Sequence, residues 1–318
     1  MADDDLEKTL EGPEAEDQLN EEQRRTVSRR DLARNDLFED VSPEVGEMDA
    51  AVVEEAMDEQ PDEMLSLLAE LTGATDVKLR ALAQHLAGRL VLDLSKSGPT
   101  KGLGVGRLKS VPMDETGGDI DLDQSIEALQ MSTATGSVPE LADLRVRSWT
   151  RPETALCLVI DRSGSMNGER LAAAAVAVAA AAQRAPEDYA VVAFSDRALV
   201  VKSRDRHRPT ADVVNDVFRL RGAGPTDLAL ALRTASAQLA RSKASRKRII
   251  LLSDCRPTAG TEPEAECGAI DELHIIAPAD DCDDARSFAE EVGARWAPLS
   301  GPSAIPAVFA QLHSASQG

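Results

Sequence analysis

Positive charge is scarce in this sequence: 35 Lys and Arg residues stand against 56 Asp and Glu residues, for a formal net charge of −21. A protein that binds a nucleic-acid backbone needs a basic surface that releases the counterions of the phosphates. The acidic balance therefore disfavours nucleic acid as a partner and favours basic protein surfaces or cations.

Cysteine is also scarce. The four cysteines, at positions 157, 255, 267 and 282, form no CxxC pair, which disfavours a disulfide framework and a structural zinc site and suits a reducing cytosol. For Cys255, beside Asp254, two interpretations stay open: a redox-active thiol or a neutral filler.

Long apolar runs are almost absent. The one long run, "LAAAAVAVAAAA", is too short and too rich in alanine to span a membrane convincingly. The acidic beginning "MADDDLEKTLEG" has no apolar segment typical of a secretory signal. We therefore expect a cytoplasmic location.

Nucleotide-binding motifs are missing too. "SKSGPTKGLGVGRLKS" contains neither GxxxxGK[ST] nor a complete GxGxxG, so the chain is not expected to be a P-loop ATPase. Its glycines predict a mobile loop, and Lys96, Lys101, Arg107 and Lys109 make it a basic island in an acidic chain.

The sequence divides into three predicted regions. Residues 1–45 are dominated by Asp, Glu, Gln and Arg with few large apolar side chains, which predicts a disordered acidic tail that either solubilises the chain or docks a partner. Residues 46–148 are predicted to be a smaller helical region that includes the glycine- and lysine-containing loop. Residues 149–318 are predicted to form the main domain.

The spacing of leucines predicts the helices of this region. Apolar residues recur at helical intervals on either side of "TGATD", which predicts two amphipathic helices. The residues that make this pattern are Met64, Leu65, Leu67, Leu68 and Leu71, then Leu79, Leu82, Leu86 and Leu90.

The segment "GGDIDLDQSIEAL" places Asp119, Asp121 and Asp123 at alternate positions, which suggests a calcium loop. An EF-hand loop would need Gly where Gln124 stands and Glu where Gln130 stands. We therefore expect Asp123 to cap a helix that begins near Gln124, with the other two carboxylates solvated.

After Trp149 apolar runs alternate with helical patterns. The runs are "TALCLVI", "YAVVAF", "RIILLS" and "ELHIIA", and the helical patterns cover residues 169–185, 226–242, 281–292 and 303–315. This alternation predicts an α/β fold, a doubly wound and mostly parallel sheet covered by helices on both faces. The alanines of residues 172–182 would let one helix lie close to the sheet.

Three loops of this fold carry oxygen-bearing side chains. Asp161 and Asp254 each directly follow a predicted strand. Ser163 and Ser165 lie two and four positions after Asp161, and Thr226 lies just before a predicted helix. In an open parallel sheet ligands bind beyond the carboxyl ends of the strands. These hard oxygen ligands suit Mg²⁺, or Mn²⁺, and leave the ion incompletely coordinated, so that a carboxylate from another protein could complete it.

The motif "DRSGSM" with Thr226 and Asp254 resembles the metal-ion-dependent adhesion site (MIDAS) of von Willebrand factor A (VWA) domains. That resemblance implies direct metal contact by Ser163, Ser165 and often Thr226, with Asp161 and Asp254 acting largely through water. In this family a Gly-Gly-Thr sequence more commonly leads to the threonine, and "GAGPTDL" departs from it. Direct metal contact by Thr226 is therefore the part of the predicted set that matches the family pattern least.

The N-terminal helical region, the glycine-rich loop and "GDIDLDQSIEAL" further resemble CoxE-like bacterial proteins that work with MoxR-type AAA+ ATPases. The resemblance implies a non-enzymatic, magnesium-dependent adaptor or co-chaperone. It would capture a partner protein through a carboxylate and help a MoxR-type ATPase to remodel or mature a client.

Other functions remain as alternatives. An aspartate-nucleophile phosphatase would also use an Asp after the first strand, but Ser163 stands where its general acid would be. A serine hydrolase lacks its GxSxG motif, and the histidines at 85, 207, 274 and 313 are scattered. A VWA scaffold with no metal role is the third alternative.

Overall fold

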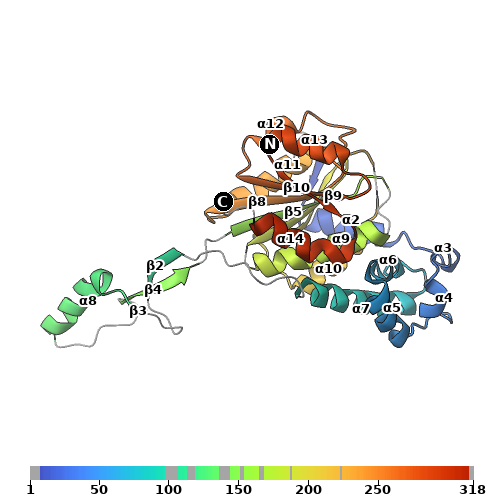
Figure 1. Cartoon of the computed structure of the whole chain (residues 1–318), viewed down its shortest axis with the longest axis horizontal. Helices are drawn as coiled ribbons and strands as arrows, with labels where there is room; N and C mark the ends of the chain where they lie inside the picture. Colours follow the sequence, from blue (N-terminus) through green and yellow to red (C-terminus); the bar gives the residue numbers. More distant parts are fainter. Residues whose placement is uncertain are drawn as a thin grey trace. The chain divides into compact units, whose positions relative to one another are not determined.

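The computed structural model describes residues 8–96, 107–112, 119–135, 144–150, 154–164, 168–186, 188–222 and 224–314 (Figure 1). The chain divides into two units, Met1–Gly102 with Thr154–Gly318 and Leu103–Glu153.

The larger unit is built on a seven-stranded sheet of order β1-β7-β6-β5-β8-β9-β10. Its strands are β1 (Thr9–Leu10), β5 (Thr154–Asp161), β6 (Tyr189–Phe194), β7 (Ala198–Lys202), β8 (Arg246–Leu252), β9 (Glu272–Pro278) and β10 (Arg295–Leu299). Neighbouring strands run parallel except β6 and β7, which are antiparallel. The predicted doubly wound, mostly parallel sheet is confirmed.

Helices cover both faces of this sheet (Figure 1). One face carries α9 (Gly168–Arg184), α10 (Thr210–Val217) and α14 (Ile305–Ser314), and the other carries α11 (Leu228–Ala240), α12 (Glu264–Cys267) and α13 (Asp283–Val292). Strand β5 feeds both cores because successive side chains point to opposite faces. Leu156, Leu158 and Ile160 enter the first core, and Ala155, Cys157 and Val159 enter the second.

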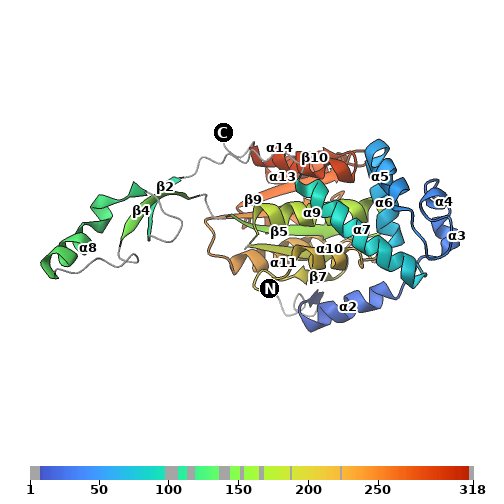
Figure 2. The same ribbon diagram turned by 90° about the horizontal axis from the view of Figure 1, so that it is seen from below.

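The alanine-rich helix α9 is buried between two layers. The sheet lies on one side, and α6 (Pro61–Leu71) and α7 (Val77–Lys96) pack on the other (Figure 2). Every residue from Leu171 to Ala182 is buried. Small side chains allow close approach on both sides: a Cβ added at Gly168 would lie 2.3 Å from the backbone oxygen of Ser66.

The N-terminal residues differ from the prediction. Residues 8–45 contain β1 and three helices, α2 (Pro13–Gln23), α3 (Arg29–Leu32) and α4 (Phe38–Val41), instead of a disordered tail. They and the next helix, α5 (Ala50–Glu59), belong to the same unit as the sheet, so residue 46 is not a domain boundary. Composition failed here because each short helix supplies one or two apolar groups, such as Leu19, Leu32 and Phe38, which neighbouring elements bury.

The described residues of the smaller unit form an antiparallel sheet of order β2-β4-β3 and one helix. Its elements are β2 (Arg107–Pro112), β3 (Asp119–Ile120), α8 (Leu122–Thr135) and β4 (Arg145–Thr150). Trp149 therefore lies in β4, and the alternating domain resumes at Thr154 rather than at residue 149. Of the predicted basic loop, residues 97–106 lie outside the described residues, and the part from Arg107 onward is a strand.

The helix of this unit begins earlier than expected. Helix α8 starts at Leu122, and the Gln124 amide donates to Asp121 Oδ1 at 3.4 Å. Asp121, which is buried, therefore caps the helix in place of the predicted Asp123. Across the described part of the chain, no helix combines the length and apolar character needed to cross a membrane.

Candidate functional site at the sheet edge

The first predicted site residue, Asp161, closes strand β5. Its carboxylate is held from two sides: the Ser163 amide donates to Oδ1 at 2.8 Å, and the Ser253 hydroxyl donates to Oδ2 at 2.5 Å. Gly164, with φ of 63°, turns the chain immediately afterwards. The loop after β5 thus folds back onto its own aspartate and fixes the orientation of that carboxylate.

Asp254 follows strand β8, which pairs in parallel with β5 so that Ile160 lies opposite Leu252. The chain runs from β5 outward through β6 and β7 and then back to β8 on the other side, so β5 and β8 flank the point where the strand order reverses. This is where ligands bind in open α/β sheets. The topology brings Asp161 and Asp254 to one edge, as predicted.

The two carboxylates influence each other. Burial raises the pKa of Asp254 above its usual value, and the negative charge of Asp161 raises it further. The Arg256 amide, which donates to Asp254 Oδ1 at 3.2 Å, and the charge of Arg170 act in the opposite direction. Asp254 therefore lies in a partly buried and already acidic environment.

A small cavity of about 60 Å³ lies between these strand ends. Its polar lining is Asp161, Arg170, Ser253 and Asp254, and its other walls are apolar residues of β5, α9, β8, β9 and β10. Arg170 and Ser253 were not singled out from the sequence. Their sequence signals were weak. Ser253 is a hydroxyl residue just before Asp254, and Arg170 is a basic residue in the first turn of the helix that follows the motif.

Thr226 is buried in the loop before α11. Its amide donates to Thr258 Oγ1 at 2.8 Å, and its carbonyl accepts from the Thr258 and Ala259 amides at 3.0 and 3.1 Å. The adjacent Asp227 caps α11 through the Leu230 amide at 2.9 Å. These bonds tie the threonine loop to the loop that follows Asp254.

The two serines differ in what the structure describes. Ser163 is half-buried and bonded through its amide to Asp161. Ser165 lies outside the described residues, which omit positions 165–167. Within the described residues no three His, Cys, Asp or Glu side chains are grouped to hold an ion, and the predicted set uses only two carboxylates.

Cys255 adjoins the site but is buried, and its backbone has a positive φ of 58°. Burial and the charges of Asp161 and Asp254 raise the pKa of its thiol well above the usual range. A thiol that resists ionisation suits the filler interpretation better than the redox one.

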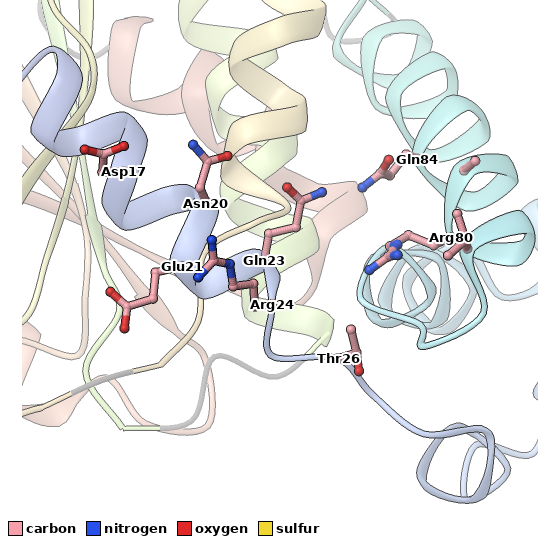
Figure 3. Close-up of a pocket in the computed structure, with 10 residues that line it drawn as sticks. Asp17, Asn20, Glu21, Gln23, Arg24, Thr26, Arg80 and Gln84 are labelled. Atoms are coloured by element: carbon pink, nitrogen blue, oxygen red, sulfur yellow. The ribbon is translucent and has the colours of Figure 1, made fainter.

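A larger cleft, of about 840 Å³, lies elsewhere, between α2 and α7 (Figure 3). Its lining is polar and of mixed charge, with Asp17 and Glu21 from α2, Arg80 and Gln84 from α7, and Arg24 just after α2. None of the predicted site residues lines it.

The family comparison matches residues 156–256 to the von Willebrand factor type A domain. A curated relative, the uncharacterized protein sll0103 of Synechocystis sp., is 34% identical over 102 residues, which cover 31% of this chain and 24% of the relative. The matched stretch is therefore a quarter of that protein's length.

Solved structures with a similar fold have low sequence identity to this chain. A von Willebrand factor type A protein from Catenulispora acidiphila has a TM-score of 0.42 and 21% identity over 53% of this chain and 44% of its own. Proximal thread matrix protein 1 from the mussel byssus has a TM-score of 0.44 and 14% identity, covering 52% and 48%. An aerotolerance-related membrane protein from Bacteroides fragilis has a TM-score of 0.42 and 11% identity, covering 51% and 99%.

The family match begins inside strand β5 and ends just after Asp254, so it includes the parts of β5, α9 and β8 that line the cavity, while the walls from β9 and β10 lie beyond it. Residues 156–256 of this chain are a von Willebrand factor type A domain.

Proposed function

We propose that the sheet edge at Asp161 and Asp254 binds one Mg²⁺ or Mn²⁺ ion and captures a partner protein through a carboxylate. The observation that carries the proposal is the shared cavity, in which the charge of Asp161 helps to raise the pKa of Asp254. A cation at this edge would offset the repulsion between the two carboxylates.

The residues at this edge fit a hard cation. Magnesium takes oxygen ligands and keeps several waters, and the set offers only carboxylate and hydroxyl oxygens. Both oxygens of Asp161 already accept a hydrogen bond, which leaves each with capacity for a water. In the proposal Ser163, Ser165 and Thr226 would contact the ion, while Asp161 and Asp254 hold its waters.

The ion, when bound, supplies an electrophilic centre for a carboxylate of another protein. The chain's own residues orient that centre and set its net charge: three neutral hydroxyls leave it more positive than a site built from carboxylates. The chain as a whole carries a net charge of −21, so an acidic partner group would be repelled in the absence of the ion.

The partners in this proposal include a MoxR-type AAA+ ATPase, and the pair remodels or matures a client protein in the cytoplasm. The support comes from the sequence resemblance of the helical region and of "GDIDLDQSIEAL" to CoxE-like proteins. The latter segment lies in the separate unit of residues 103–153, as a module added to the VWA domain would. The chain is a non-enzymatic adaptor, and any ATP hydrolysis belongs to its partner.

A capture experiment from the native cell tests the proposal. The full chain, immobilised in Mg²⁺ or in EDTA, is compared with Thr226→Ala, with an Asp161→Ala, Ser163→Ala double variant, and with Asp283→Ala, whose side chain is 85% exposed. We expect EDTA, the double variant and Thr226→Ala to weaken capture, Asp283→Ala to leave it unchanged, and one Asp or Glu of the captured protein to account for most of the loss. Equal capture in EDTA and by the double variant would contradict the metal bridge.

A further inference from the structure

The second residue of the site motif "DRSGSM", Arg162, forms a buried ion pair. Arg162 stands between Asp161 and Ser163, and its guanidinium is bonded to the carboxylate of Glu22, with the two side chains 3% and 2% exposed. Glu22 belongs to α2, in the N-terminal residues whose sequence predicts disorder. The loop that carries the site serines is therefore anchored to a distant segment of the chain.

The same carboxylate also holds the second site loop. Glu22 Oε2 accepts from the backbone amide of Arg221 at 2.9 Å, in the loop that leads to Thr226. Its other oxygen also accepts from the Gln18 side chain at 3.0 Å. Glu22 thus links the loop after β5 to the loop before α11 and is itself supported from its own helix.

Helix α2 is placed to do this. It packs beside β7 (Figure 2). Its buried residues, Ala15, Leu19 and Glu22, recur at helical spacing on one face. The opposite face carries Asp17, Asn20 and Glu21 toward the larger cleft (Figure 3). Its side toward the sheet therefore presents one charged group, Glu22, to the two loops.

A second N-terminal helix supports the other end of the same loop. Burial raises the pKa of Glu70 in α6, and the backbone amide of Gly168, at the start of α9, acts on it in the opposite direction. A Cβ at Gly168 would lie 2.7 Å from Glu70 Cγ, so α6 and the start of α9 are in tight contact. Arg162 and Gly168, on either side of the loop after β5, thus both contact N-terminal helices, the first through an ion pair and the second through close packing.

We propose that Glu22 is a positioning residue for the metal site and that the N-terminal helices form part of that site's support. This inference rests on the proposed function for its metal readout. Metal affinity depends on holding ligands and the groups behind them in the correct geometry. When Glu22 is removed, Arg162 loses its partner and both loops lose their common anchor.

The experiment uses the full chain and two readouts. Mn²⁺ is titrated by calorimetry, and amide hydrogen exchange is measured at Ser163 and Thr226, whose amides do not touch Glu22. We expect Glu22→Gln to weaken Mn²⁺ binding about tenfold or more and to speed exchange at both amides by a similar factor. The exposed Glu16→Gln on the same helix should match wild type.

Two further variants separate positioning from lost folding. Gln18→Ala removes one bond to Glu22 and should weaken Mn²⁺ binding by about two- to threefold, which keeps the test open if Glu22→Gln does not fold. An Arg162→Gln, Glu22→Gln double variant should lose no more affinity than the worse single variant, because both substitutions cut the same link.

The outcomes are distinguishable. The proposal is overturned if Glu22→Gln matches Glu16→Gln in exchange, or if exchange rises equally at strand amides of β5 and β8, which indicates general destabilisation. If wild type binds no Mn²⁺, or Asp161→Ala binds it unchanged, the metal-binding function fails, and the exchange at Ser163 and Thr226 still decides whether Glu22 positions the loops.

Discussion

Glu22 and Arg162 pair their charges inside the protein although 140 positions separate them in the chain. The pair joins an N-terminal helix to the residue that follows the first strand of the VWA domain. A buried charge without its partner is costly, so neither residue can be removed without consequence for the other. Residues 8–45 are therefore a structural part of the larger unit.

This pairing predicts the effect of Glu22→Ala on stability. The substitution leaves the buried Arg162 guanidinium uncompensated, and we expect the free energy of unfolding to fall by about 3 kcal/mol. Urea denaturation of the full chain measures it, with the exposed Glu16→Ala as a control that should change stability by less than about 0.5 kcal/mol. If residues 1–45 were only a solubilising tail, their deletion would leave the free energy of unfolding unchanged. We expect the deletion to lower it.

Metal binding is the second prediction. Isothermal titration with Mg²⁺ or Mn²⁺ should show one weak site in the isolated chain, because the set is completed only when a partner carboxylate arrives. Asp161→Ala or Ser163→Ala should abolish the heat of binding while circular dichroism stays unchanged. If both variants bind the ion as well as the Asp283→Ala control does, the ion binds elsewhere in the chain.

The third prediction separates the adaptor from a phosphatase. The purified chain should hydrolyse neither ATP nor p-nitrophenyl phosphate in Mg²⁺, because it has no P-loop and has Ser163 where the general acid would be. Phosphate release assays test this directly. Magnesium-dependent release that Asp161→Asn abolishes would support the enzyme alternative.

Two glycine substitutions make a matched pair for the fourth prediction. Gly168→Ala places a Cβ 2.3 Å from the Ser66 backbone oxygen, so α9 or α6 must shift, and we expect a loss of about 2 kcal/mol together with weaker Mn²⁺ binding. Gly88→Ala in α7 meets only Asn215 Oδ1 at 3.7 Å and should instead stabilise the chain by up to about 1 kcal/mol. Thermal and urea denaturation compare the two variants. If Gly168→Ala is as stable as wild type, the contact between Gly168 and Ser66 has room for a methyl group.

The fifth prediction is a pH dependence from Lys202, at the end of β7. Burial lowers the pKa of this ammonium to about 8, even though its Nζ donates to the Tyr189 carbonyl at 2.6 Å and lies 4.1 Å from the Tyr189 ring centroid. Between pH 8 and about 10.5 the unfolded chain therefore binds a proton that the folded chain does not. The contribution of Lys202 to stability consequently rises with pH across this window, by about 1 to 3 kcal/mol.

Lys202→Met tests this sign. The difference in unfolding free energy between wild type and Lys202→Met should shift in favour of wild type as the pH rises from about 8 to 10, whereas the exposed Lys243→Met should show no such shift. Taking the difference removes the contributions of the other titrating groups. A difference that does not depend on pH would show that Lys202 stays charged in the folded chain.

Local pattern was enough to predict the frame of the domain. The predicted runs at 154–160 and 189–194 coincide with β5 and β6, and the helix predicted at 169–185 is α9 within one residue at each end. The two strands are continuous apolar runs and the helix is long and rich in alanine, so each element carries its own local signal. Shorter or less regular elements were missed, among them β7, β10 and α10, because a five-residue strand gains its stability from the neighbour with which it pairs.

The sequence by itself determined the order of β5, α9, β6, α11, β8 and β9 along the chain, the α/β class, and the meeting of Asp161 and Asp254 at one edge. That meeting follows from two strand ends and the topology of parallel sheets. Only the tertiary structure decided that Ser253 bonds Asp161, that Arg170 lines the cavity, and that Glu22 reaches both loops. Each of these depends on contacts between residues far apart in the chain, and a local pattern does not encode the partner of such a contact. The same reason explains α2: its few apolar groups could not stabilise a helix alone, and the sheet edge and Arg162 supply what its composition lacks.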